Sequence, residues 1–156
     1  MRMSLFLSTF IHKIDKKGRV SVPASFRAIL RKSATKGFVA FRSPTLEAID
    51  GFAMENMEAL ASRIDGFQLF SEDQTDLTAS IFADADVLMF DGDGRVMLTE
   101  ALREHAGVDD SIAFVGRGPT FQLWHPQRFE DYQKQARERL KISRPKLGAK
   151  PDQVAS

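Results

Sequence analysis

The stretch HKIDKKGRVSVP at residues 12–23 returns in outline as FDGDGRVMLT at residues 90–99. Both stretches contain Asp-x-x-Gly-Arg followed by alternating apolar residues, and 76 positions separate Asp15 from Asp91. At the same offset Arg27 falls on Arg103, and a similar offset places a second Pro-Thr pair on the first. The chain therefore contains two copies of one unit of roughly 45 residues.

Each Asp-x-x-Gly-Arg motif predicts a tight turn between two strands. Gly18 and Gly94 stand where a hairpin turn needs positive φ. Asp15 and Asp91 suit the start of the turn, where a carboxylate accepts backbone N–H groups. These four residues are therefore predicted to shape the two turns.

The rest of each copy predicts a short helix and then a second hairpin. The helices begin after Pro23 and at Thr99, both of which are typical of a helix start. Apolar runs bounded by turn residues predict the strands of the second hairpins. These strands are expected at residues 37–41, 46–49, 111–115 and 121–124.

Helical periodicity appears between the copies, at residues 51–64 and 76–85, and again from Pro126 onward. The tail from Ser143 is rich in Pro, Lys and Gly, so it is expected to be disordered. The sequence thus predicts an α+β fold with a first repeat at 5–51, a helical connector at 52–85, a second repeat at 86–129, a C-terminal helix at 130–142 and a disordered tail at 143–156.

Charge is strongly segregated along a chain whose net charge is only +1. Residues 12–36 hold eight Lys or Arg and one acid, whereas residues 47–93 hold twelve acids and one Arg. Residues 131–156 hold seven Lys or Arg and three acids. This distribution suits a surface for a polyanion, with an acidic segment kept away from it or set against a neighbouring subunit; ordinary solvated faces are an alternative.

Several classes of function find no support in the sequence. There is no cysteine, no metal-ligand spacing among the three histidines, no nucleophile elbow and no phosphate-binding glycine loop. Enzyme activity, a metal site, a cofactor and a small-molecule substrate are therefore not expected. No segment approaches a membrane span or a secretory signal, so a cytoplasmic location is expected. Trp124 ends the strand predicted at 121–124 and is expected in the core; stacking on a nucleic-acid base is the alternative.

The doubled Asp-x-x-Gly-Arg turn, the Pro-Ala-x-Phe-Arg that follows the first, and HAGVDDSIAFVGRGPTFQLWHPQRF in the second copy together resemble the MraZ family. The resemblance implies a tandem-repeat, swapped-hairpin AbrB-like β-barrel with flanking helices. It also implies a ring-shaped homo-oligomer that binds double-stranded DNA at direct repeats upstream of the division and cell-wall gene cluster. Such a protein would be a nucleoid-associated transcriptional regulator, often a repressor.

Arg19 and Arg95 are the first candidates for DNA contact. A rigid turn that ends in Gly-Arg presents a guanidinium able to make paired hydrogen bonds to phosphate or to guanine. Lys13, Lys16 and Lys17 would contact phosphates without reading sequence. Alternatively, each arginine only forms an ion pair with the aspartate four residues earlier, and both roles are compatible.

Two other functions remain open: an antitoxin-like module that binds a protein partner, and a ring-forming scaffold whose arginines are structural. The two motifs also differ, because Gly92-Asp93 replaces Lys16-Lys17. On sequence alone, the first turn is therefore predicted to provide more of the DNA affinity.

Overall fold

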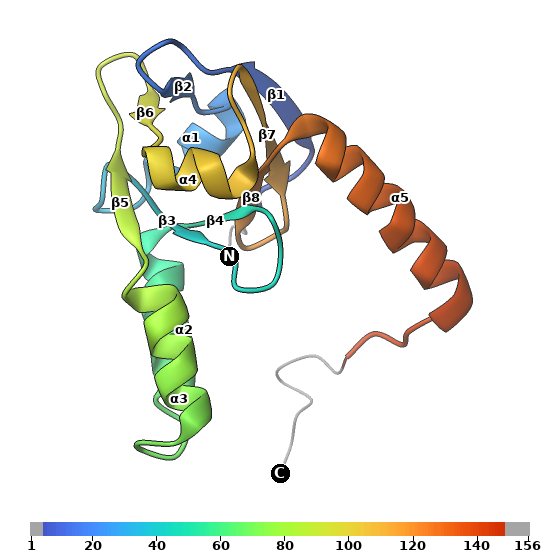
Figure 1. The fold of residues 1–156 in the computed structure, drawn as a ribbon. Helices are drawn as coiled ribbons and strands as arrows, with labels where there is room; N and C mark the ends of the chain where they lie inside the picture. Colours follow the sequence, from blue (N-terminus) through green and yellow to red (C-terminus); the bar gives the residue numbers. More distant parts are fainter. Residues whose placement is uncertain (1–4, 149–156) are drawn as a thin grey trace. The chain divides into compact units, whose positions relative to one another are not determined.

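The structure, a computed structural model, describes residues 5–148 and has an α+β fold. Its contacts divide the chain into a compact unit that ends at Pro126 and a second unit that starts at Gln127. The first unit contains both Asp-x-x-Gly-Arg turns (Figure 1). Its elements are β1 (Thr9–Lys13), β2 (Arg19–Ser21), α1 (Ala24–Leu30), β3 (Gly37–Arg42), β4 (Ile49–Phe52), α2 (Met54–Ile64), α3 (Glu72–Leu77), the π-helix η1 (Thr78–Phe82), β5 (Asp86–Met89), β6 (Arg95–Met97), α4 (Glu100–Ala106), β7 (Ser111–Gly116) and β8 (Phe121–Trp124).

The strands of the two copies are interleaved in an antiparallel sheet. The six-stranded sheet has the order β1-β7-β8-β4-β3-β5, and β2 pairs with β6 in a separate two-stranded ribbon. Strand β1 of the first copy thus pairs with β7 of the second, and β5 of the second pairs with β3 of the first. Neither copy builds its sheet from its own strands alone.

The predicted barrel is wrong in one respect, because the described strands do not close into a barrel. The sheet ends at edge strands β1 and β5, and the β2–β6 ribbon pairs only three residues of each strand. The ribbon connects to β1 through one bridge, Ile14 with Val20, and to β5 through the N–H of Asp91, which donates to the carbonyl of Arg95 at 2.8 Å. These short connections do not extend into continuous strand pairing.

The main core lies between the large sheet and helices α1 and α4. It includes five closely packed phenylalanines, with ring centroids 4.8–6.4 Å apart in contacting pairs: Phe6, Phe26, Phe38, Phe114 and Phe121. Strand β3 is buried on both faces. Phe38 points into the main core, whereas Val39 and Phe41 pack with Met57 of α2 and Ile81 of η1. Because successive side chains of a strand point to opposite faces, β3 packs against the main core on one face and against the helical connector on the other.

The short helices of the two copies begin as predicted. Pro23 precedes α1, and the Thr99 hydroxyl caps α4 by accepting from the N–H of Leu102 at 3.2 Å. Gly107 ends α4 with φ of 68°, which is the left-handed conformation that glycine adopts readily. Trp124 is buried as predicted, and its indole N–H donates to Oε1 of Gln122 at 2.9 Å.

Two elements begin at other residues than predicted, because side-chain hydrogen bonds fix the backbone just before them. The strand expected at residues 46–49 is β4, which starts at Ile49, because the Ser43 hydroxyl accepts from the N–H groups of Thr45 and Leu46 and holds a turn. The helix expected at residues 76–85 starts earlier, at Glu72, because Ser71 caps it. It then continues into the π-helix η1.

Helices α2 and α3 lie at the end of the first unit opposite the β2–β6 ribbon (Figure 1). The second unit contains α5 (Pro126–Ser143) apart from that helix's first residue, and α5 is the helix predicted from Pro126 onward. This helix has no buried residue. Residues 149–156 of the predicted disordered tail lie outside the described residues.

Candidate nucleic-acid interface

The first turn is held together by the Asp15 carboxylate. Its Oδ1 accepts from the backbone N–H groups of Lys17 at 2.9 Å and Arg19 at 2.8 Å. Its Oδ2 accepts from Nε of Arg19 at 2.6 Å. Gly18, with φ of 88°, donates its N–H to the Asp15 carbonyl at 3.0 Å and closes the turn. The aspartate therefore fixes both the backbone of the turn and the guanidinium of Arg19.

The second turn repeats this geometry. Oδ1 of Asp91 accepts from the N–H groups of Asp93 and Arg95, each at 2.9 Å, and Oδ2 accepts from Nε of Arg95 at 2.9 Å. Gly94, with φ of 74°, donates to the Asp91 carbonyl at 3.1 Å. One contact is additional: Nη2 of Arg95 donates to Oδ2 of Asp93 at 3.2 Å.

Both aspartates are stabilised in their charged form. The pKa of Asp15 is lowered, chiefly by the hydrogen bond from the backbone N–H of Arg19, with desolvation opposing it. The pKa of Asp91 is lowered for the same reason by the N–H of Arg95. Hydrogen bonds to a carboxylate favour its ionised form, so each turn has an intact ion pair at neutral pH.

The two arginine side chains are about 30% exposed, at 30% for Arg19 and 29% for Arg95. Nε of Arg19 is used by Asp15, and its Nη atoms make no hydrogen bond to any residue in the described range 5–148. A guanidinium has five N–H donors, so four stay available on this side chain. The ion pair therefore orients the arginine and leaves its other N–H groups available for a ligand.

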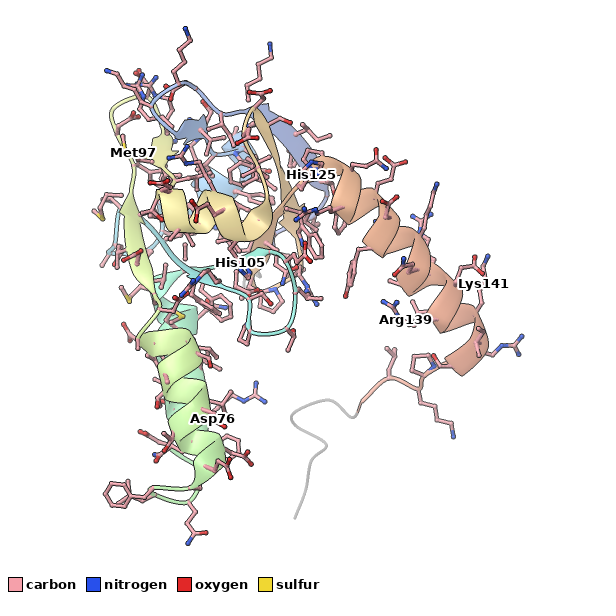
Figure 2. The ribbon with its side chains drawn as sticks, in the orientation of Figure 1. Asp76, Met97, His105, His125, Arg139 and Lys141 are labelled. Carbon is pink, nitrogen blue, oxygen red and sulfur yellow. The ribbon has the colours of Figure 1, made fainter. Side chains whose placement is uncertain are left out.

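The two turns lie side by side at one end of the first unit, at the top of Figure 1. In the ribbon Val20 pairs with Val96, and the carbonyl of each turn glycine accepts from the opposite strand: Gly94 from Val22 at 3.2 Å and Gly18 from Leu98 at 2.9 Å. An approximate twofold axis through the ribbon relates the two turns. Exposed Met97 of β6 lies at this end (Figure 2).

Each turn packs against the short helix of the other copy. A Cβ added at Gly94 would overlap Nη1 of Arg27 in α1, and one added at Gly18 would lie 3.4 Å from Cζ of Arg103 in α4. Nε of Arg27 and of Arg103 are buried without a hydrogen-bond partner among the described residues. These two arginines occupy equivalent places in the repeat and form the inner walls of the two turns.

The remaining predicted DNA contacts are three exposed lysines. Lys13 ends β1, and Lys16 and Lys17 occupy the middle of the first turn. The structure brings all three to the same turn as Arg19, whereas the second turn has Gly92 and Asp93 at the positions of Lys16 and Lys17.

The sequence of this chain is similar to those of known proteins. The sequence model described as "MraZ protein, putative antitoxin-like" matches residues 81–145, which include the second turn. The protein named "Transcriptional regulator MraZ" from Rickettsia bellii (strain OSU 85-389) is 44% identical over 131 residues, which cover 83% of this chain and 87% of the relative. This chain belongs to the MraZ family. The resemblance read from the two motifs is thus confirmed.

Other MraZ relatives cover the chain to a similar extent. The protein of the same name from Rickettsia akari (strain Hartford) is 40% identical over 136 residues, 87% of this chain and 91% of the relative. The one from Pelagibacter ubique (strain HTCC1062) is 39% identical over 143 residues, 92% of each chain. The match of 143 residues is long enough to include both turns and the connector between them.

The repeat aligns Arg27 with Arg103, but the sequence pattern of this MraZ-family chain assigns neither residue to the site. The repeat offset was the available signal, yet the crossing of helix and turn between the copies appears only in the structure. No group of three His, Asp or Glu in the described chain is placed to hold a metal ion. None of the described helices is both long and apolar enough to cross a membrane.

Proposed function

We propose that this chain is a transcriptional regulator that binds double-stranded DNA through its two Asp-x-x-Gly-Arg turns. The observation that carries the proposal is the pair of matching turns at one end of the first unit, each with an arginine oriented by an aspartate. The printed name of the relatives, transcriptional regulator, agrees with this function.

The chemistry of the turns suits DNA. A guanidinium held at Nε can use its Nη groups for paired hydrogen bonds to a phosphate or to O6 and N7 of guanine. Both Nη groups of Arg19 are free for this, whereas Nη2 of Arg95 also donates to Asp93 at 3.2 Å. Because Asp15 and Asp91 already fix these side chains, less rotamer entropy is lost on binding. Lys13, Lys16 and Lys17 add phosphate contacts that position the protein on the duplex.

The acidic connector is compatible with this orientation. Helices α2 and α3 contain Glu55, Glu58, Glu72, Asp73 and Asp76. Asp76 lies far from the ribbon end of the unit (Figure 2). A duplex bound at the turns would therefore meet little repulsion from Asp76, since exposed charges more than about 10 Å apart are largely screened at 0.1 M salt. Glu55 lies nearer to the second turn, because it accepts from the Ser33 hydroxyl at 2.8 Å in the loop after α1.

We extend the proposal to the finer features that the family resemblance implies. The interleaved strands would be a swapped-hairpin fold within one chain, and subunits would assemble into a nucleoid-associated ring. The ring would bind direct repeats upstream of the division and cell-wall gene cluster and repress it. Several turns on spaced repeats would raise the overall affinity by roughly 10²- to 10⁴-fold over one subunit.

The test is a titration of labelled duplex DNA from upstream of the chain's own gene, at several NaCl concentrations. Arg19→Ala is expected to weaken binding and reduce the salt dependence, since each phosphate contact contributes about −0.9 to the log–log slope. Arg63→Ala in α2 is the matched control for loss of one exposed cation. Unchanged affinity and slope for Arg19→Ala, with the assembly intact by light scattering, would exclude the DNA contact.

A second candidate is an antitoxin-like module that binds a protein. It is favoured by the family description and by three exposed apolar side chains between α2 and α3: Phe67, Leu69 and Phe70. The same titration separates the candidates, because this module requires no DNA binding at low salt. In the third alternative, a ring-forming scaffold, Arg19→Ala would disrupt the assembly instead.

A further inference from the structure

A groove of about 380 Å³ lies between the end of α1 and the second turn. Three basic residues from the first copy meet the turn of the second copy there. The groove is lined by Arg27, Arg31, Lys36, Phe90, Asp91, Gly92 and Gly94.

The two copies supply opposite charge to the turn that each covers. Residues 24–36, which cover the second turn, contain four Lys or Arg and no acid. The corresponding residues 100–110, which include the wall of the first turn, contain four acids and only Arg103 as a cation. The acidic turn thus lies beside the basic segment, and the lysine-containing turn lies beside the acidic segment.

Equivalent positions make this difference specific. Arg31 ends α1, where Gly107 ends α4. The Lys36 carbonyl accepts from the N–H of Phe90 at 2.9 Å, and on the other side the Asp110 carbonyl accepts from the N–H of Ile14 at 2.8 Å. Two cations at the second turn therefore correspond to a glycine and an acid at the first.

The cations of the groove are not neutralised within the unit. The side chains of Arg31 and Lys36 are exposed and have no ion pair or hydrogen bond with another described residue. The one carboxylate in the lining, Asp91, already accepts from two backbone N–H groups and from Arg95. Arg27 is fixed against Gly94 with its Nε unpartnered, and a Cβ at Gly92 would meet no atom within 4 Å. The groove is therefore open and has three basic residues, and its one carboxylate is already engaged by the second turn.

We propose that this groove binds a phosphate of the DNA backbone next to the second turn, with Arg31 and Lys36 as the contacting side chains. Arg27 is a positioning residue that forms the wall behind them. This inference rests on the proposed DNA-binding function and adds which residues provide the positive charge at the second turn. The second turn has no lysines of its own, and residues of the first copy provide the positive charge beside it.

The test compares Arg31→Ala, Lys36→Ala and the control Arg63→Ala by fluorescence anisotropy. The probe is a fluorescein-labelled duplex of the DNA upstream of the chain's own gene, over a NaCl series. Each groove variant is expected to weaken binding roughly 3- to 10-fold near 150 mM NaCl and to reduce the salt slope by about 0.9. Arg63→Ala should change neither quantity.

Double variants assign the contact to the second turn. Arg31→Ala combined with Arg95→Ala should be non-additive because the two residues act at one place, whereas Arg31→Ala combined with Arg19→Ala should be additive. If the wild-type chain binds DNA and the groove variants match Arg63→Ala, the groove proposal is wrong and the proposed function stands. If the wild-type chain binds no duplex at low salt, both proposals are wrong.

Discussion

The two turns of this chain share one backbone geometry but obtain their positive charge from different places. The first turn contains Lys16 and Lys17 in its own sequence and packs against an acidic helix segment. The second contains Gly92 and Asp93 and packs against α1 and the basic residues after it. The net charge of a repeat in the sequence therefore differs from the charge that surrounds its turn in the structure, because each turn packs against the helix of the other copy.

The largest expected effect is loss of either turn arginine. Arg19→Ala and Arg95→Ala are each expected to weaken DNA binding roughly 10- to 100-fold, which is the range for losing a paired hydrogen-bond contact. Because the groove compensates for the missing lysines, the two losses should be similar. Parallel anisotropy titrations of both variants measure this directly.

Arg19→Lys and Arg95→Lys are the controls for that comparison. They keep the charge but lose the planar fork, so they should recover the salt slope more than the affinity. A loss confined to Arg19→Ala would instead support the asymmetry predicted from sequence alone and contradict the crossed supply of charge.

The turn glycines should respond differently to Gly→Ala. Both have positive φ, which costs an L-residue about 1–2 kcal/mol. A Cβ at Gly18 would also lie 3.1 Å from the backbone oxygen of Leu98, whereas one at Gly94 would displace the flexible end of Arg27. Gly18→Ala should therefore lower the free energy of unfolding more, and Gly94→Ala should lower DNA affinity more.

Urea unfolding and DNA titration of both glycine variants separate these effects. Gly118→Ala is the matched control, since Gly118 also has positive φ (81°), its Cβ would meet nothing within 4 Å, and it lies outside both Asp-x-x-Gly-Arg turns. Equal loss of DNA affinity in the two variants would mean that displacing Arg27 has no consequence for binding.

Acid should destabilise the protein through both turns. The pKa values of Asp15 and Asp91 lie below the ordinary value of 3.8, chiefly because of backbone N–H hydrogen bonds from Arg19 and Arg95. A carboxyl with a lowered folded pKa stabilises the folded state above its unfolded pKa, and this stability is lost as pH falls through the folded pKa. The temperature at the midpoint of thermal unfolding should therefore decrease when the pH is lowered below about 4.

Asp15→Asn with Asp91→Asn should reduce that drop, as measured by thermal unfolding over a pH series. Asp84 contributes a shared background, since the hydrogen bond from Arg42 lowers its pKa. Asp50 acts in the opposite direction, because desolvation raises its pKa. An identical pH dependence in the double variant and the wild type would exclude the turn carboxylates as a source of acid sensitivity.

Much of the fold could be predicted from local signals. The turn glycines, Thr99 as a helix cap and the strand at Phe121–Trp124 follow from residue type and periodicity, and the structure has each of them. The errors at Ile49 and Glu72 come from the Ser43 and Ser71 hydroxyls, which compete for backbone N–H groups. Such a competition depends on side-chain geometry that a sequence pattern does not specify.

The candidate site was predictable only in part. The motif predicts a site at Arg19, Arg95 and the aspartates, because a five-residue turn closes on itself. Arg31 and Lys36 come to the second turn through pairing between distant strands, from Gly37 with Met89 to Ala40 with Asp86. No local pattern contains that information.

The smallest expected effect concerns the one contact that the first turn lacks. Oδ2 of Asp93 accepts from Nη2 of Arg95 at 3.2 Å, and the Asp93 side chain is 79% exposed. Asp93→Asn weakens this competition for the guanidinium, so affinity should rise by roughly 2- to 5-fold, in line with the small energies of exposed ion pairs. The gain should disappear in the Arg95→Ala background. A gain that persists there would mean that Asp93 acts by general repulsion of DNA, independently of the second turn's arginine.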